Sequence, residues 1–317
     1  MKAMNPARVK IIRKLIHTWY RTHQRPFIWR TLRDPYAILL SEIMLQQTQA
    51  DRVEEKLPLF LKKFPTFDAL AGASKADILR AWQGLGYNNR AARLWDLARI
   101  VVEQFGGKLP ADVNTLERLP GIGLYTARAV ACFAFRKHTS VVDVNVRRVL
   151  SRIFWKRKTC PDVQGERDIS LIAEQILPRD TQSWNQALMD LGSTTCKAQK
   201  PHCLACPVSR TCRSRHLNPH QKRRSHSGCA PKKVAMRVEP VYLDVPRRIW
   251  RGSIVEVLRS VNGRGSISMP ELGKSIKPDF TNRELPWLSS LIDALLRDDI
   301  VSTTGRRNDA RVMLAHK

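Results

Sequence analysis

LPGIGLYTARAVACFAF, residues 119–135, places Gly121 and Gly123 between two segments with the apolar spacing of helices. Glycine adopts positive φ without steric cost and lets the backbone approach a ligand closely. The helix that follows begins with unpaired N–H groups and the positive end of the helix dipole, which together bind phosphate. Two glycines alone are a weak signal, and a simple turn between helices is the alternative. In a basic, helical chain the stretch predicts a helix–hairpin–helix that binds a phosphate backbone.

An aspartate stands shortly after this stretch, at the start of another predicted helix. The sequence SVVDVNVRRVLSRIF, residues 140–154, places Asp143 before that helix and Asn145 in its first turn. Any aspartate in this position can be an N-cap, and that interpretation stays open. A capping carboxylate near a helix start also remains ionised. Asp143 is therefore a candidate catalytic anion as well as a candidate cap.

One glutamate interrupts an apolar helical run, PYAILLSEIMLQQT, residues 35–48. A buried carboxyl costs free energy unless it has partners. The plain interpretation of Glu42 is a structural glutamate satisfied by backbone groups. The alternative is a catalytic acid, kept protonated by its apolar setting until it donates its proton to a leaving group.

The charge balance indicates a polyanionic partner. The chain has 55 Lys and Arg against 28 Asp and Glu, a formal net charge of +27. The basic residues are spread along the chain rather than gathered on one amphipathic helix, which favours nucleic acid over an acidic membrane surface. The N-terminal residues show neither an apolar signal core nor a small-residue cleavage site. We therefore expect a cytoplasmic, nucleoid-associated protein.

Four of the seven cysteines lie within CKAQKPHCLACPVSRTC, residues 196–212, with the spacing C-x6-C-x2-C-x5-C. Disulfides are rare in the cytoplasm, so four thiols this close together predict a metal site. Zinc and an iron–sulfur cluster both accept four thiolates, and spacing alone does not separate them. The predicted ligands are Cys196, Cys203, Cys206 and Cys212. The other three cysteines are interpreted as core or incidental residues: Cys132, Cys160 and Cys229.

The hydrophobic periodicity predicts a mainly α fold without βαβ alternation. Residues 1–212 form the main helical unit, and residues 213–245 are polar and basic, which predicts a linker. In residues 246–317 three helical segments precede two strands around a basic turn, a pattern typical of a winged helix-turn-helix. Beyond a first helix near the N-terminus and one opening at Pro35, helices of the main unit are expected at 52–63, 74–82, 89–105, 114–119, 124–135, 145–155, 166–177 and 184–191.

These motifs together resemble the HhH-GPD superfamily of base-excision DNA glycosylases. LPGIGxxTA is similar to its hairpin, and an aspartate shortly after the hairpin is its second mark. SEIMLQQTQ, residues 41–49, resembles the adenine-DNA glycosylase (MutY) group within it. The resemblance covers residues 8–212 and implies an enzyme of base excision repair that binds double-stranded DNA with a mispaired or damaged base. The cysteine spacing resembles the 4Fe-4S loop of this group and of endonuclease III, which implies that cofactor rather than zinc.

The resemblance also implies roles for individual residues. Glu42 would protonate the departing base, and Asp143 would stabilise the positive charge that develops on the sugar. Tyr125 stands where bifunctional members have a lysine, and a phenol cannot form their imine, so a monofunctional hydrolase is expected. Tyr125 would instead order the sugar or the attacking water. The residues implied to contact DNA or the base are Trp29, Arg30, Gln47, Thr48, Gln49, Tyr87, Gly121, Gly123 and Gln186.

Several departures keep alternatives open. Asn88 stands in place of the second tyrosine of the family's GLGYY motif, and Tyr87 could simply pack between helices. No Nudix-like domain follows the cysteines, although longer adenine glycosylases use one to recognise 8-oxoguanine. RTLRDPY, residues 30–36, also resembles archaeal thymine–guanine mismatch glycosylases. A glycosylase for T or U opposite G is therefore the alternative enzyme, and a non-enzymatic iron–sulfur DNA-binding regulator is the alternative from another class.

Overall fold

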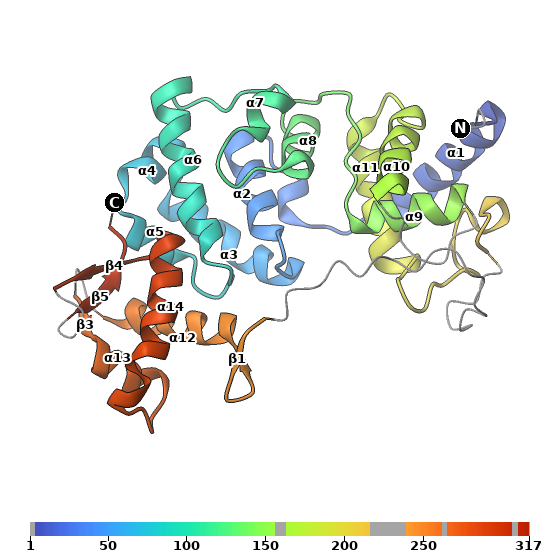
Figure 1. Cartoon of the computed structure of the whole chain (residues 1–317). Helices are drawn as coiled ribbons and strands as arrows, with labels where there is room; N and C mark the ends of the chain where they lie inside the picture. Colours follow the sequence, from blue (N-terminus) through green and yellow to red (C-terminus); the bar gives the residue numbers. More distant parts are fainter. Residues whose placement is uncertain (1–3, 156–162, 216–238, 262–264, 306–309, 317) are drawn as a thin grey trace. The chain divides into compact units, whose positions relative to one another are not determined.

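A computed structural model describes residues 4–155, 163–215, 239–261, 265–305 and 310–316 (Figure 1). The chain divides into two compact units. The first unit comprises residues 1–38, 111–117 and 123–234, and the second comprises residues 39–110, 118–122 and 235–317. Within the described ranges, no helix combines the length and the apolar character needed to cross a membrane.

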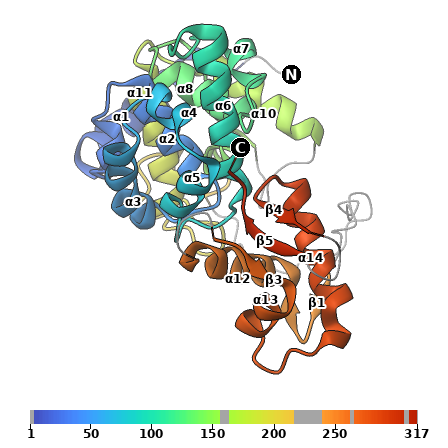
Figure 2. The same ribbon diagram turned by 90° about the vertical axis from the view of Figure 1, so that its left-hand side faces the viewer.

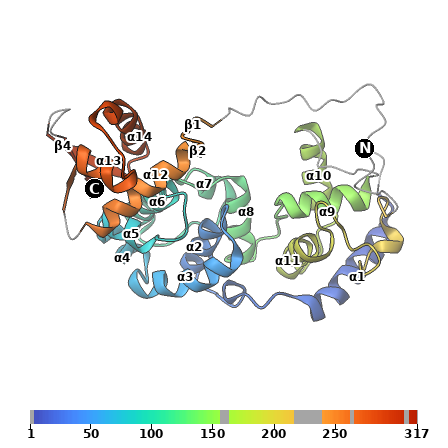
Figure 3. The same ribbon diagram turned by 90° about the horizontal axis from the view of Figure 1, so that it is seen from below.

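The first unit is a group of helices around one apolar core. Helix α1 packs along α11, and α9 contacts both α10 and α11 (Figure 3). Ile12, Ile16, Ile153 and Trp184 are almost fully buried in this core. Burial of such side chains contributes about 1.5–3 kcal/mol each, which is the main stabilisation of the unit. Its elements are α1 (Pro6–His23), η1 (Ile28–Arg30), α7 (Val113–Glu117), α8 (Leu124–Phe133), α9 (Val144–Phe154), α10 (Val163–Gln175), α11 (Thr181–Asp190), the π-helix η2 (Leu191–Thr195) and η3 (Ser209–Thr211).

Helices also form the larger part of the second unit. Helix α2 (Pro35–Leu45) begins in the first unit and continues into the second, where α3 (Ala50–Lys63), α4 (Phe67–Gly72), α5 (Lys75–Ala81) and α6 (Asn89–Phe105) follow. Helix α4 packs closely on α6, and α5 contacts the same helix. The aromatic rings of Phe60 and Trp82 meet edge to face, with their centroids 5.8 Å apart. This packing fixes the ends of α5 and α6, between which an exposed loop lies.

The C-terminal region of the second unit is a small α+β arrangement (Figure 2). Three antiparallel strands lie in the order β3-β5-β4, with Ile267 opposite Val312 and Val301 opposite Leu314. The buried faces of three helices supply the core, with Leu258, Leu272 and Leu288 almost inaccessible to solvent. The elements are β1 (Val241–Tyr242), β2 (Val245–Pro246), α12 (Arg247–Ser260), β3 (Ile267–Ser268), α13 (Met269–Ile276), η4 (Asn282–Glu284), α14 (Leu285–Arg297), β4 (Val301–Thr304) and β5 (Arg311–Leu314).

The predicted mainly α fold with a small α+β C-terminal region is confirmed. Every helix expected from periodicity is present, with its ends shifted by a few residues. Helix α4 was not predicted, although its signals are ordinary: Thr66 caps it by accepting from the Ala69 amide, and Phe67 and Leu70 are buried. The strand β3 and the β1–β2 hairpin were also missed, since strands of two residues have no periodicity to detect. Most of the predicted linker lies outside the described residues, and the proposed domain boundaries remain predictions.

Candidate functional site

The glycine hairpin has the backbone that its sequence predicts. Gly121 has φ +78°, a conformation that strains any residue with a Cβ, and a Cβ at this position would be crowded, 3.2 Å from the Cβ of Arg93. The Ile122 amide donates to the Leu119 carbonyl at 3.1 Å and closes the turn. Gly123 is exposed and is the N-cap of α8, where a Cβ would meet nothing within 4 Å. The first turn of α8 is therefore open to a ligand such as phosphate.

Asp143 is the N-cap of α9, as the plain interpretation expected. Its Oδ1 accepts a 2.6 Å hydrogen bond from the Val146 amide, and its Oδ2 accepts from Asn145 Nδ2 at 2.8 Å. The carboxylate is half-buried, so it is both fixed in direction and open to a ligand. Capping and catalysis are compatible here, because a carboxylate that accepts from the helix start can still present its charge to a ligand.

A chain of hydrogen bonds continues from Asn145 to the cysteine segment. Arg148 Nη2 donates to Asn145 Oδ1 and to the Gly192 carbonyl, both at 2.7 Å, and its Nε donates to the Cys196 carbonyl at 2.8 Å. A Cβ on Gly192 would lie 2.6 Å from the Cβ of Asn145, so glycine is required for this close approach. The orientation of Asp143 thus depends on the π-helix and on the residues that follow it.

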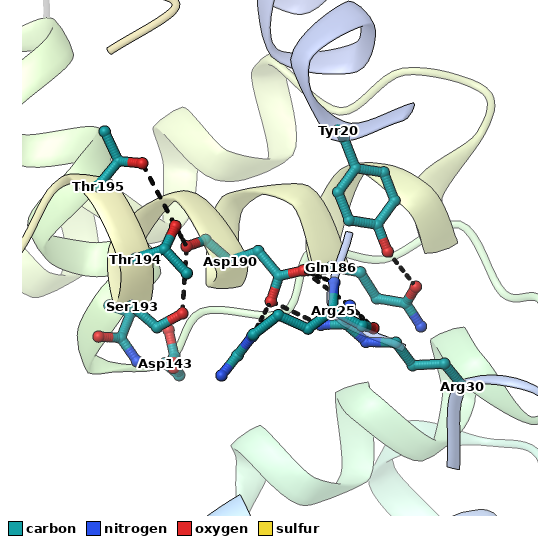
Figure 4. A network of polar contacts seen from close by, with 10 residues as sticks. Tyr20, Arg25, Arg30, Asp143, Gln186, Asp190, Ser193, Thr194 and Thr195 are labelled. Carbon is teal, nitrogen blue, oxygen red and sulfur yellow. Dashed lines mark hydrogen bonds and ion pairs between the residues drawn. The ribbon is translucent and has the colours of Figure 1, made fainter. Parts of the chain in front are cut away.

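A fully buried aspartate at the end of α11 organises a second polar network in this unit (Figure 4). Asp190 accepts two hydrogen bonds of 2.7 Å from Arg30 and a third of 2.7 Å from Arg25 Nε. Burial opposes ionisation of Asp190, but the hydrogen bonds from Arg30 and Arg25 outweigh it and lower its pKa. This network fixes η1, where Trp29 stacks on Phe27 with ring centroids 4.4 Å apart.

Gln186 lies one turn before Asp190 on the same helix. Its Oε1 accepts a 2.8 Å hydrogen bond from the Tyr20 hydroxyl, which fixes the direction of the amide. Arg30 and Gln186, predicted from separate motifs, are therefore attached to one framework of α1, η1 and α11 (Figure 4). Trp29, the residue before Arg30, belongs to η1 of the same framework. The sequence analysis missed Tyr20, Arg25 and Asp190, which hold these residues in place. Their role shows only in contacts between segments far apart in the sequence.

Two loops of the second unit are joined by one buried arginine. The guanidinium of Arg90 donates to the carbonyls of Met44 at 2.8 Å and Leu85 at 2.9 Å, and to Thr48 Oγ1 at 2.9 Å. Arg90 is only 8% exposed, and burial lowers the pKa of its guanidinium to about 10. Sequence reasoning missed Arg90, although an arginine beside a glycine-rich loop is a recognisable signal. The Arg90 side chain holds the segment after α2 against the segment before α6.

Both of these loops contain a residue other than glycine in the left-handed region. Gln47 has φ +57° and Tyr87 has φ +45°. Such backbone is costly for residues with a Cβ and is concentrated at functional sites. Tyr87 is 52% exposed, which does not fit a tyrosine that simply packs between helices. Gln47, Thr48, Gln49 and Tyr87 line one groove of the second unit, with a volume of about 1080 Å³.

The two predicted catalytic carboxyls belong to different units. Glu42 is 7% exposed in the apolar helix α2, within the second unit, and Asp143 lies in the first. Their convergence on one sugar stays a prediction. Tyr125 lies in the first turn of α8 and is half-buried against the small apolar cluster of Ala129, Cys132 and Val141.

The four clustered cysteines all lie in described parts of the first unit, as free thiols. Burial raises the pKa of Cys206 to about 12, and the neighbouring thiols of Cys196, Cys212 and Cys203 add to that effect. Arg152 contributes a donor 3.4 Å from Cys196 Sγ. Among the described residues, no group of three or more His, Cys, Asp or Glu side chains stands in a metal-binding arrangement. Cys132 is fully buried, as expected for a core residue, and Cys160 and Cys229 lie outside the described residues.

Comparison with known proteins identifies the family of this chain. A model of HhH-GPD superfamily base excision DNA repair proteins matches residues 40–175. The adenine DNA glycosylase of Mycolicibacterium smegmatis is 37% identical over 307 residues, which are 94% of this chain and 94% of that protein. The thymine/uracil-DNA glycosylase of Methanothermobacter thermautotrophicus is 34% identical over 205 residues, which are 64% of this chain and 92% of that protein. A solved structure of a thermostable thymine-DNA glycosylase matches with a TM-score of 0.61 and 33% identity, over 66% of this chain and 97% of that chain.

The chain therefore belongs to the HhH-GPD superfamily of base excision DNA repair proteins. Within the superfamily, two mycobacterial adenine DNA glycosylases match 88–94% of its length. The resemblance inferred from the hairpin and from SEIMLQQTQ is thus confirmed, and with it the expectation of a DNA N-glycosylase. The roles of individual residues remain predictions.

Proposed function

We propose that this protein is a monofunctional DNA N-glycosylase that removes adenine mispaired with guanine or 8-oxoguanine. The observation that carries the chemistry is Glu42, a carboxyl that is 7% exposed in the apolar helix α2. A buried carboxyl of this kind can act as the general acid that protonates a leaving base. The preference for adenine is supported by the Mycolicibacterium smegmatis adenine glycosylase, which matches over 94% of both chains.

The reaction divides between two carboxyls. A base inside the duplex is inaccessible, so the nucleotide is first extruded from the stack. Glu42 donates its proton to the departing adenine while the bond between the base and the sugar breaks. The carboxylate of Asp143, at the N-terminus of α9, stabilises the positive charge that develops on the sugar. Water then adds to the sugar carbon and releases a proton, which restores the acid form of Glu42, and Tyr125 orders the sugar or that water.

The product of this reaction is an abasic site with an intact strand. Tyr125 offers a phenol where an imine-forming lysine would be needed for strand cleavage. We expect the product strand to remain uncut until alkali is added, and borohydride to trap no covalent complex. Strand cleavage at neutral pH together with a trapped complex would exclude the monofunctional mechanism.

Recognition of the mispair is proposed to involve two groups of residues. Gln47, Thr48, Gln49 and Tyr87 of the second unit contact the duplex around the vacated position. Gln186 and Trp29 of the first unit contact the extruded base, while Arg30 acts through its two hydrogen bonds to Asp190. Gly121 and Gly123 bring the backbone close to a phosphate of the strand.

A 4Fe-4S cluster on Cys196, Cys203, Cys206 and Cys212 is part of the proposal. The described side chains are not drawn together in a metal-binding arrangement, but the donor set fits by its chemistry. Burial and the neighbouring thiols raise the pKa of Cys203, Cys206 and Cys212, and a bound cation would offset that cost. Bound there, the cluster would supply structure, tying the end of α11 to the segment after it. Iron content and absorbance near 400 nm of the purified protein test this, and zinc without iron would overturn it.

A glycosylase for thymine or uracil opposite guanine is the second candidate, favoured by the 34% identity with the Methanothermobacter enzyme. The deciding experiment presents purified protein with duplexes containing A opposite 8-oxoguanine, A·G, A·C, T·G and U·G. The proposal expects excision from the first two, whereas cleavage confined to T·G and U·G would overturn it. No excision from any duplex would favour the DNA-binding regulator. Action on chromosomal DNA would place the protein on the nucleoid.

A further inference from the structure

The loop between α5 and α6, residues 84–88, is an unusually constrained segment and is called here the Tyr87 loop. Gly84, Gly86 and Tyr87 all have positive φ, of +86°, +71° and +45°. Positive φ strains the backbone of Tyr87 because tyrosine has a Cβ, whereas glycine does not. The surrounding structure must therefore hold Tyr87 in this conformation. Arg90 and Trp82 hold the loop from within, through the Gly86 carbonyl at 3.1 Å from each donor.

A further contact comes from the C-terminal region. Arg259 on α12 donates from Nη2 to Asn88 Oδ1 at 2.7 Å and from Nε to the Leu79 carbonyl at 2.9 Å. Its side chain is only 5% exposed. Nη1 of Arg259 pairs with the carboxylate of Glu256. That carboxylate also accepts a 2.9 Å hydrogen bond from Gln83 Nε2. Arg259 therefore contacts both sides of the Tyr87 loop, at the end of α5 and at the start of α6.

A buried lysine makes a second connection to the same region. Lys75, at the start of α5, is 1% exposed and pairs with Asp299, which precedes β4, and with Asp96 of α6 at 3.3 Å. A buried ammonium is stable only while it is paired, so loss of Asp299 would be costly. Asp299 thus joins the C-terminal region to α5, and the same Lys75 joins α5 to α6.

We propose that Arg259 is a positioning residue for DNA recognition. It holds Asn88, and through Asn88 the left-handed Tyr87, in the conformation that presents the exposed phenol ring to a mispaired duplex. The C-terminal region thereby acts on DNA recognition through the loop, at a position where the chain has Asn88 in place of an aromatic residue. The role of Arg259 in holding the loop does not depend on the proposed function. Only the identity of the ligand, a mispaired duplex, rests on it.

The first test is made on the free full-length protein by hydrogen exchange of the peptide covering residues 84–91. Arg259→Met removes the donors and keeps an apolar side chain of similar length. We expect about tenfold faster exchange in this peptide, with the peptides of α14 unchanged. Asn88→Ala, which leaves the contacts of Arg259 with Leu79 and Glu256 in place, should produce the same change. Arg297→Met removes an exposed arginine of the C-terminal region and is the matched control. Unchanged exchange in both loop variants would overturn the proposal.

The second test is a double-mutant cycle on affinity for a duplex with a hydrolysis-resistant 2′-fluorinated adenosine opposite 8-oxoguanine. Arg259→Met should weaken binding about tenfold in the wild-type background and have no further effect in the Tyr87→Ala background. Equal effects in both backgrounds would overturn the proposal, because Arg259 would then act independently of Tyr87. If the wild-type protein excises no mispaired base, the proposed function fails. The exchange measurement still decides in that case whether Arg259 holds the loop.

Discussion

Asn145 donates a 2.8 Å hydrogen bond from Nδ2 to Oδ2 of Asp143, two residues before it. The amide therefore stabilises the ionised carboxylate and fixes its direction. Arg148 in turn holds Asn145 through a 2.7 Å hydrogen bond to its Oδ1. The proposed stabilising anion is thus supported from two sides, by the start of α9 and by a polar chain that reaches the Cys196 carbonyl.

Replacing Glu42 by glutamine should almost abolish excision. The amide keeps the size of the side chain but cannot donate a proton to the leaving base, and loss of a general acid costs about 10²- to 10⁴-fold in rate. The rate is measured under single-turnover conditions, and duplex affinity should stay close to that of the wild type. Near wild-type excision by Glu42→Gln would contradict the acid role.

Replacing Asp143 by asparagine should separate its two roles. Asparagine caps helices about as well as aspartate, so the melting temperature should fall only by the loss of the hydrogen bond from Asn145 Nδ2. The negative charge is lost, and excision should fall by at least about a hundredfold. Asp143→Ala is the comparison, because it loses both the cap and the charge and should also be destabilised. An asparagine variant that is inactive only because it is unfolded would contradict this prediction.

Replacing Gly192 by alanine should displace Asn145 and weaken the support of Asp143. The new Cβ would lie 2.6 Å from the Asn145 Cβ, a distance that forces a shift. Overpacking of this kind costs about 1–3 kcal/mol, measured by denaturant unfolding, and excision should fall with it. Gly252→Ala in α12 is the control, since nothing lies within 4 Å of its Cβ and alanine favours helix. Equal stability of the two variants would refute the packing argument.

The buried Asp190 should make folding sensitive to acid. Its pKa is lowered in the folded protein, so its contribution to stability is complete above the unfolded value near 4 and is lost as pH falls through the folded value. Asp190→Asn should be destabilised at pH 7, and the difference from the wild type should shrink below about pH 4. Asp293→Asn on α14 is the control. A difference that stays constant from pH 7 to pH 3 would contradict the linkage.

Local sequence patterns account for most of the fold. Helices such as α6 and α9 follow from apolar spacing over many residues, and Asp143 from its place before a helix. The short helix α4 and the two-residue strands were missed because their patterns are too brief for a period to emerge. Glu42 and Gln47 were found only because they stand within one continuous motif.

The sequence alone determined the mainly helical class, the glycine hairpin, the cluster of thiols and the family of the chain. Each of these depends on residues that lie close together in the sequence. Only the tertiary structure revealed Asp190 between Arg25 and Arg30, Arg90 between two loops, and Arg259 against Asn88. These partners lie far apart in sequence, and a buried charge shows its role only when its counterpart is in place. The physical reason is that hydrogen bonds and ion pairs act over a few ångströms of space, whatever the distance along the chain.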